Sequence, residues 1–263
     1  MVSLELLKEC RLEFEENFLT LISDSPESQS RVEDVRAHSM RVASYSALLS
    51  KYVLQTDEER NIAEVIALFH DYGRAVLIVQ GNESPINIQH NHAALSAKLV
   101  QQMEFYSKLP ADVQITIHKA IESHNKLKLP KLDSEQQTLY SKLLRDADKL
   151  DILESSYRFF KEKNGLQPLV TLDLINQVEV SEKIIKSILA GKTASVEDMK
   201  SMNDYRLLLL SMAFDLNFKY SFRILSEKQL TQKIYETLPK RDQIIDAYRA
   251  IKLFIENKFV AST

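Results

Sequence analysis

The sequence predicts an all-α protein. Only four of its 263 residues are glycine and six are proline, whereas tight β-turns depend on both residue types. Apolar residues also recur at the three-to-four-residue spacing of amphipathic helices, starting with a stripe across residues 4–22. Because a β-sandwich or barrel needs far more turn residues than this chain has, we expect helices joined by short loops.

Capping patterns place the starts of two further helices. Thr56 is followed by Glu59, and Ser134 by Gln137, which is the spacing of a capping box. Helices should therefore begin near residues 57 and 135. The helices expected in the first two thirds of the chain span residues 4–22, 30–54, 57–72, 88–107, 111–125 and 135–162.

Glycines indicate where two of these helices end. Gly73 should end the third helix, and residues 74–87 should form a loop. Gly165, with the asparagine before it, should end the long helix, so we place a domain boundary between residues 1–163 and 164–263. The second region is expected to pack on the first as a helical extension, with helices at 172–190, 196–224 and 241–258.

Composition narrows the classes of protein. The net charge is -3 with both signs interspersed, so a nucleic-acid-binding track is not expected. Cys10 is the only cysteine, which excludes an intrachain disulfide and a thiolate metal cluster. The first residues lack the basic start and apolar stretch of a signal peptide, and no apolar run approaches the ~20 residues that span a bilayer. We expect a cytoplasmic protein without a membrane partner.

A His-Asp pair ends one of the apolar helices. His70 and Asp71 follow Ala-Leu-Phe, and the partial negative charge at a helix C-terminus favours a cation. Imidazole and carboxylate are good ligands for divalent ions. His38 lies on the apolar face of the preceding helix, where a lone histidine is usually a hydrogen-bonded core residue. The His-Asp dipeptide is weak evidence by itself.

Two aspartates interrupt the apolar face of the helix expected at 135–162. Asp146 and Asp148 lie two residues apart, about 200° around the helix axis, so both cannot face one ion. Asp148 shares a face with Leu144 and Ile152.

The order His38, then His70-Asp71-Tyr-Gly-Arg74, then Asp146-Ala-Asp-Lys-Leu-Asp resembles the HD-domain superfamily of metal-dependent phosphohydrolases, over about residues 30–160. The resemblance implies an HD-domain helical bundle with an additional C-terminal helical region. It also implies a divalent metal ion, whether Mn, Fe, Zn, Mg, Ni or Co, bound within the first domain. Its ligands would be His38, His70, Asp71 and, from the family's Ala-Asp-(Arg/Lys)-Leu pattern, Asp148. Asp146 would then be exposed or would orient a histidine.

The same resemblance gives His92 and His124 two alternative roles. They would bind a second ion or the scissile phosphate, or they would line the pocket without touching metal. One or two ions per chain are therefore open. His90 should be a surface or loop residue, and His118 a structural one.

Four further residues have roles to weigh. The resemblance implies that Asp71 helps to deprotonate the attacking water. Arg74 should clamp a phosphate oxygen, with a surface salt bridge as the alternative. Lys149 should face solvent, with phosphate binding as the alternative. Cys10 should be a core residue rather than a nucleophile.

The predicted function is a metal-dependent phosphohydrolase that acts on a nucleotide or a related phosphoester. The alternative is a catalytically inactive HD-fold protein that binds a nucleotide or serves as a scaffold, but such a protein should have lost a ligand. A homodimer through residues 166–263 is an open possibility. The hydrolase hypothesis requires His38 and Asp148 to lie within ~8 Å of the His70–Asp71 pair, since metal ligands share one ion.

Overall fold

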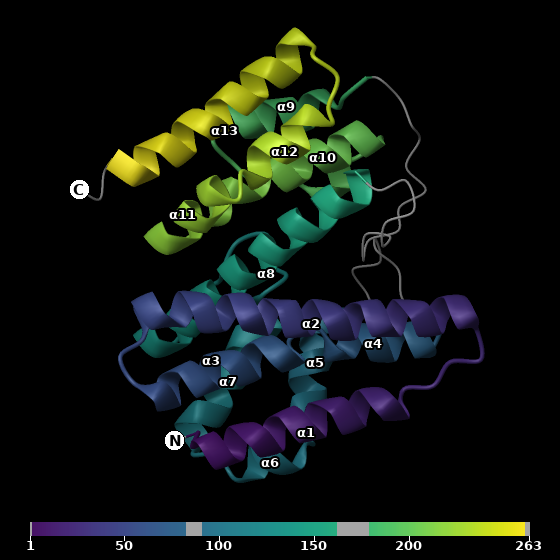
Figure 1. Cartoon of the computed structure of the whole chain (residues 1–263), viewed down its shortest axis with the longest axis vertical. Helices are drawn as coiled ribbons and strands as arrows, with labels where there is room; N and C mark the ends of the chain where they lie inside the picture. Colours follow the sequence, from purple (N-terminus) through teal and green to yellow (C-terminus); the bar gives the residue numbers. More distant parts are fainter. Residues whose placement is uncertain (1, 83–90, 162–178, 261–263) are drawn as a thin grey trace. The chain divides into compact units, whose positions relative to one another are not determined.

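The computed structural model describes residues 2–82, 91–161 and 179–260, and within these ranges it contains helices and no β-strand (Figure 1). The all-α prediction is therefore confirmed. No helix in the described ranges combines the length and the apolar character that crossing a membrane requires.

The chain divides into two compact units, Met1–Asp148 and Lys149–Thr263. The division falls inside one long helix, α8, directly after the predicted ligand Asp148. The boundary predicted between 163 and 164 lies outside the described residues and stays a prediction.

Eight helices occur in the described part of the first unit, the last of them continuing into the second. They are α1 (Leu4–Thr20), α2 (Pro26–Val53), α3 (Asp57–Phe69), α4 (Tyr72–Val79), α5 (His92–Val100), α6 (Glu104–Ser107), α7 (Ala111–Ser123) and α8 (Glu135–Lys161).

The capping patterns identified in the sequence form as expected. The Thr56 side chain accepts a hydrogen bond from the Glu59 backbone, and the Glu59 carboxylate accepts one from the Thr56 backbone, so α3 begins with a complete capping box. The Ser134 hydroxyl likewise accepts from the Gln137 backbone at 3.1 Å where α8 begins. Both helix starts were therefore predictable from local hydrogen bonding alone.

Two boundaries differ from the prediction. The second helix begins at Pro26 rather than at residue 30, because Ser25 caps it and proline is well suited to the first helical position. Gly73 does not end a helix: it lies inside α4, whose apolar side chains are buried, so the loop expected across 74–87 is wrong for its first six residues. The helix expected at 88–107 is divided into α5 and α6, and its first three residues lie outside the described ranges.

Aromatic side chains anchor the turn between α3 and α4. Phe69, the last residue of α3, contacts Phe14 of α1 and Phe105 of α6, with ring centroids 5.6 Å and 5.0 Å apart. Tyr72, the first residue of α4, packs edge-on against Phe18 at 5.4 Å. Buried aromatic pairs of this kind stabilise a core beyond the area they bury. The two residues between them, His70 and Asp71, are thus held from both sides.

The second unit is also helical. The helix expected at 196–224 is interrupted there by short 3-10 turns and a non-helical link. The elements after α8 are α9 (Glu182–Leu189), η1 (Val196–Asp198), α10 (Met202–Ser211), η2 (Met212–Asp215), α11 (Lys219–Glu227), α12 (Leu230–Glu236) and α13 (Asp242–Val260).

Candidate metal centre

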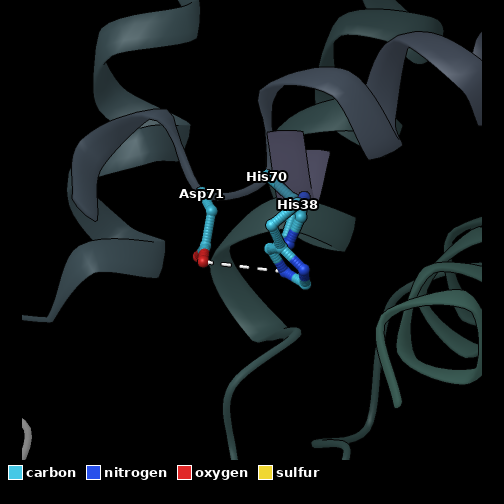
Figure 2. Close-up of side chains that lie close together, drawn as sticks. All are labelled: His38, His70 and Asp71. Atoms are coloured by element: carbon cyan, nitrogen blue, oxygen red, sulfur yellow. Dashed lines mark ion pairs between the residues drawn. The ribbon is translucent and has the colours of Figure 1, made fainter. Parts of the chain in front are cut away.

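Helix ends bring all six predicted donor residues of the first unit together. They lie on five separate parts of the chain, and four of the six stand at or beside a helix terminus. His38 is in α2, His70 and Asp71 form the turn between α3 and α4, His92 begins α5, His124 follows α7, and Asp148 is in α8. Figure 2 shows the rings of His38 and His70 side by side, with the Asp71 carboxylate facing them.

On one side of Asp71, two histidines face Asp148. The Nε2 atom of His38 lies 3.2 Å from Asp148 Oδ1 and 4.0 Å from Asp71 Oδ2. His70 Nε2 lies 3.8 Å from the same Asp148 oxygen. These distances satisfy the proximity that the hydrolase hypothesis requires of His38 and Asp148.

On the other side of Asp71, two histidines and an arginine converge. His92 Nε2 and His124 Nε2 lie 3.3 Å and 3.4 Å from Asp71 Oδ1. Arg74 Nε donates to Asp71 Oδ2 at 2.7 Å, and Arg74 Nη2 lies 3.0 Å from His92 Nε2. Asp71 is therefore shared by the two sides.

Hydrogen bonds at helix ends fix which nitrogen of two histidines faces the cluster. His70 Nδ1 lies 2.7 Å from the carbonyl oxygen of Ala67, and His124 Nδ1 lies 2.7 Å from that of Ile121. A carbonyl only accepts, so each Nδ1 carries a proton and donates it. In the neutral ring, Nε2 is then a bare lone pair directed at the carboxylates.

Two atoms at the centre lack a partner. His70 Nε2 and Asp71 Oδ1 are buried and, among the described residues, have no hydrogen-bond partner. A buried polar atom left in this state costs about 1–3 kcal/mol. Lone pairs that face one another at 3.3–3.8 Å are stabilised by a cation between them.

The protonation states suit a cation. Burial lowers the pKa of His70 to about 4, although the nearby Asp71 charge opposes the shift. Burial raises the pKa of Asp71, but the positive charge of Arg74 outweighs it and holds that pKa well below its usual value. Burial also raises the pKa of Asp148, and the hydrogen bond from His38 reverses the shift. Near neutral pH His70 is therefore neutral, and Asp71 and Asp148 are ionised, which are the forms that bind metal.

The donors form three overlapping groups, each compact enough to hold an ion. Every group has its ligand atoms within 4.8 Å of one another. The groups are His38, His70 and Asp71; His70, His124 and Asp148; and Asp71, His92 and His124. The residues present therefore fit a divalent metal ion.

Three charged side chains near the motifs are less exposed than the sequence predicted. Arg74 pairs with the buried Asp71, so the surface salt bridge weighed for it is wrong. Asp146 is fully buried rather than exposed. Lys149 does not face solvent: it is buried and lies 2.8 Å from Asp215, a partner that its own helix could not reveal.

The remaining candidates have no contact with the cluster in the described structure. His118 is half-buried on α7, 4.0 Å from Glu122, and its structural role stays a prediction. His90 lies outside the described residues. Cys10 is a core residue, as expected, and burial raises the pKa of its thiol to about 12, which disfavours a nucleophilic thiolate.

Gly73 allows α5 to approach the His-Asp turn. A Cβ at this position would lie 2.5 Å from the Ser96 backbone nitrogen and 2.6 Å from the His92 carbonyl oxygen. The Gly73 N–H also donates to the Ser96 hydroxyl at 2.8 Å. Only glycine fits here, because the neighbouring atoms belong to backbone. This close approach places His92 beside Asp71.

Arg145 is a residue whose importance sequence reasoning missed. Its buried guanidinium donates from Nη1 to the carbonyls of Ser123, His124 and Lys126, at 3.3, 2.8 and 2.6 Å. Carbonyls at a helix C-terminus have no partner within the helix and favour a cation. Arg145 thus joins α8 to the end of α7 where His124 stands. The available signal was an arginine directly after the apolar pair Leu143-Leu144.

A protein-family model described as HD domain matches residues 35–153. This range contains all six donor residues and also Gly73, Arg74 and Arg145. Searches among curated proteins and among solved structures found no match to the chain.

Proposed function

We propose, for a chain that belongs to the HD-domain superfamily through residues 35–153, that this centre hydrolyses a phosphoester with the help of a bound divalent metal ion. The family is one of metal-dependent phosphohydrolases in general. The observation that carries the proposal is the pair of buried, unpartnered atoms His70 Nε2 and Asp71 Oδ1, which face further lone pairs.

The ligands in this proposal are His38, His70, Asp71 and Asp148. Two imidazoles and two carboxylates suit manganese, iron, zinc or another divalent ion of this kind. When bound, such an ion polarises a phosphoryl oxygen and lowers the pKa of a water molecule toward neutrality.

The chain's own residues supply the other requirements. Asp71 is ionised and its Oδ1 has no hydrogen-bond partner among the described residues, so it can accept the proton that the attacking water releases. Arg74 brings a positive charge to the edge of the same cluster, which favours a phosphate nearby. Burial of His38, His70 and Asp71 limits access of bulk water to the donors.

The substrate in this proposal is a nucleotide or a related phosphoester. The likeness to the family supports this class, and the site chemistry requires only a phosphoryl group. A panel of nucleoside mono- and triphosphates, cyclic nucleotides and cyclic dinucleotides covers both monoesters and diesters.

The test is hydrolysis by purified protein supplied with Mn²⁺. We expect turnover of bis-p-nitrophenyl phosphate or p-nitrophenyl phosphate, and of at least one nucleotide in the panel. His70→Ala should abolish turnover and metal binding while the helical circular dichroism signal remains. His118→Ala is the matched control, since it removes a histidine outside the cluster. Protein that binds Mn²⁺ and nucleotide without turnover would favour the inactive binding protein, and protein that binds no metal would contradict the proposal.

A further inference from the structure

The side of Asp71 that faces Arg74 already contains a cation. Asp71, His92 and His124 form a compact group of donors, and these are the residues that a second metal ion would use. Arg74, three residues after Asp71 on α4, contacts two of them. Its Nε donates to Asp71 Oδ2 at 2.7 Å, and its Nη2 lies 3.0 Å from His92 Nε2.

The contact with His92 has only one possible direction. Arginine has N–H donors and no acceptor, so His92 Nε2 must be the acceptor. An imidazole nitrogen has a single lone pair, and a metal ion bound at about 2.0–2.1 Å would require the same one. The guanidinium and a metal ion therefore exclude each other at His92 Nε2.

We propose that Arg74 takes the place of a second metal ion, so that the centre holds a single ion. This inference rests on the proposed function, because it takes for granted the ion held by His38, His70, Asp71 and Asp148. Arginine suits the role because a guanidinium carries a permanent positive charge on a planar group with several N–H donors. Its planar fork reaches the carboxylate and the imidazole together.

Neighbouring structure keeps Arg74 in this position. Arg74 follows Gly73, whose close contact with the backbone of His92 and Ser96 fixes α4 against the first turn of α5. Arg74 is largely buried, with its side chain 15% exposed, and its partner carboxylate is 2% exposed. A charge-assisted hydrogen bond at this depth is stronger than one at the surface.

Removal of the guanidinium should open the second position. Asp71 Oδ1, His92 Nε2 and His124 Nε2 would then be three acceptors within 4.8 Å of one another, without the arginine cation. A second divalent ion would bind there.

The experiment counts bound Mn²⁺ by equilibrium dialysis, with free Mn²⁺ measured by electron paramagnetic resonance. Wild-type protein should bind about one equivalent, and Arg74→Met about two. Two Mn²⁺ ions that share Asp71 also couple magnetically, which changes the spectrum of the bound metal. Arg74→Gln is a second neutral variant in case the first folds poorly. The double variant Arg74→Met/His92→Ala is the matched control and should return to about one.

The number of bound Mn²⁺ ions separates a failure of this inference from a failure of the proposed function. Two equivalents in wild-type protein would overturn this inference and leave the hydrolase proposal standing. One equivalent in wild type and in both folded Arg74 variants would do the same. Wild-type protein that binds none would overturn the proposed function as well, so the two failures are distinguishable.

Discussion

The two sides of Asp71 have similar donors but different sources of positive charge. Toward α2 and α8, His38 and His70 face Asp148, and in the described part of the chain His70 Nε2 has no hydrogen-bond partner. Toward α4 and α5, His92 receives a contact from Arg74. Equal residue types therefore do not make equal metal sites. Whether a histidine can bind metal depends on whether a positively charged side chain, such as Arg74 at His92, already uses the lone pair of its ring nitrogen.

The largest expected effect separates the two sides by activity. His70→Ala removes a ligand on the side without a protein cation and should lower kcat/KM by about 10³-fold or more, because several kcal/mol of charge stabilisation are lost. His92→Ala should lower kcat/KM by only about 10-fold, the size of effect expected for a residue that acts through a neighbouring metal ligand. Steady-state kinetics with bis-p-nitrophenyl phosphate measures both. Equal losses in the two variants would remove the distinction.

The next effect is on the stability of metal-free protein in acid. The pKa of His70 is lowered from 6.5 to about 4 in the folded state by burial. Below pH 6.5 the unfolded chain binds a proton that the folded chain does not accept until about pH 4, so the stability contributed at higher pH is lost across that window. The expected loss is on the order of 3 kcal/mol.

Urea unfolding in EDTA at a series of pH values measures this loss. His70→Gln should show a shallower decline across the same window, while His118→Ala should follow wild type. An identical slope in His70→Gln would show that other groups cause the acid sensitivity.

A smaller effect tests how α5 is brought to Asp71. Gly73→Ala places a Cβ within 2.6 Å of two backbone atoms of α5, so the helix must move. We expect a loss of about 1–3 kcal/mol of unfolding free energy, seen as a lower Tm. Adding Ser96→Ala should not restore it, because the closest atoms belong to backbone. Full recovery in the double variant would mean that the Ser96 hydroxyl, rather than the helix, limits the space.

The smallest effect concerns Arg145. Arg145→Met removes the donor to three carbonyls at the end of α7 and should let His124 shift. Because His124 forms a compact donor group with His70 and Asp148, this shift should lower Mn²⁺ affinity by roughly 10-fold. Arg145→Lys keeps a cation and should recover part of that affinity. A variant with a lower Tm but unchanged Mn²⁺ affinity would show that Arg145 is structural only.

Local signals in the sequence predicted the helices well. The capping patterns at Thr56 and Ser134 predicted two helix starts, because capping depends on residues within one turn. Gly73 was misjudged for the opposite reason. Its role is set by the α5 backbone, a tertiary neighbour that no local pattern reveals.

In the candidate site, too, sequence motifs identified residues well but did not reveal contacts between distant parts of the chain. The motif resemblance selected six donor residues that the structure brings together, since motif spacing reports helix ends and faces. The contacts between charged side chains were harder to foresee. Lys149 was expected to face solvent but lies against Asp215, and the role of Arg145 depends on carbonyls of another helix. Side-chain partners that are distant in sequence are decided by packing, which a single sequence does not show.

The central claim is that His38, His70, Asp71 and Asp148 share one cation, and Mn²⁺ binding by Asp148→Asn tests it most directly. This change keeps the side chain's size and removes the charge that two histidines face. The account predicts Mn²⁺ affinity at least ~10²-fold weaker than in wild type, with His118→Ala unchanged. Wild-type affinity in Asp148→Asn, in folded protein, would contradict it.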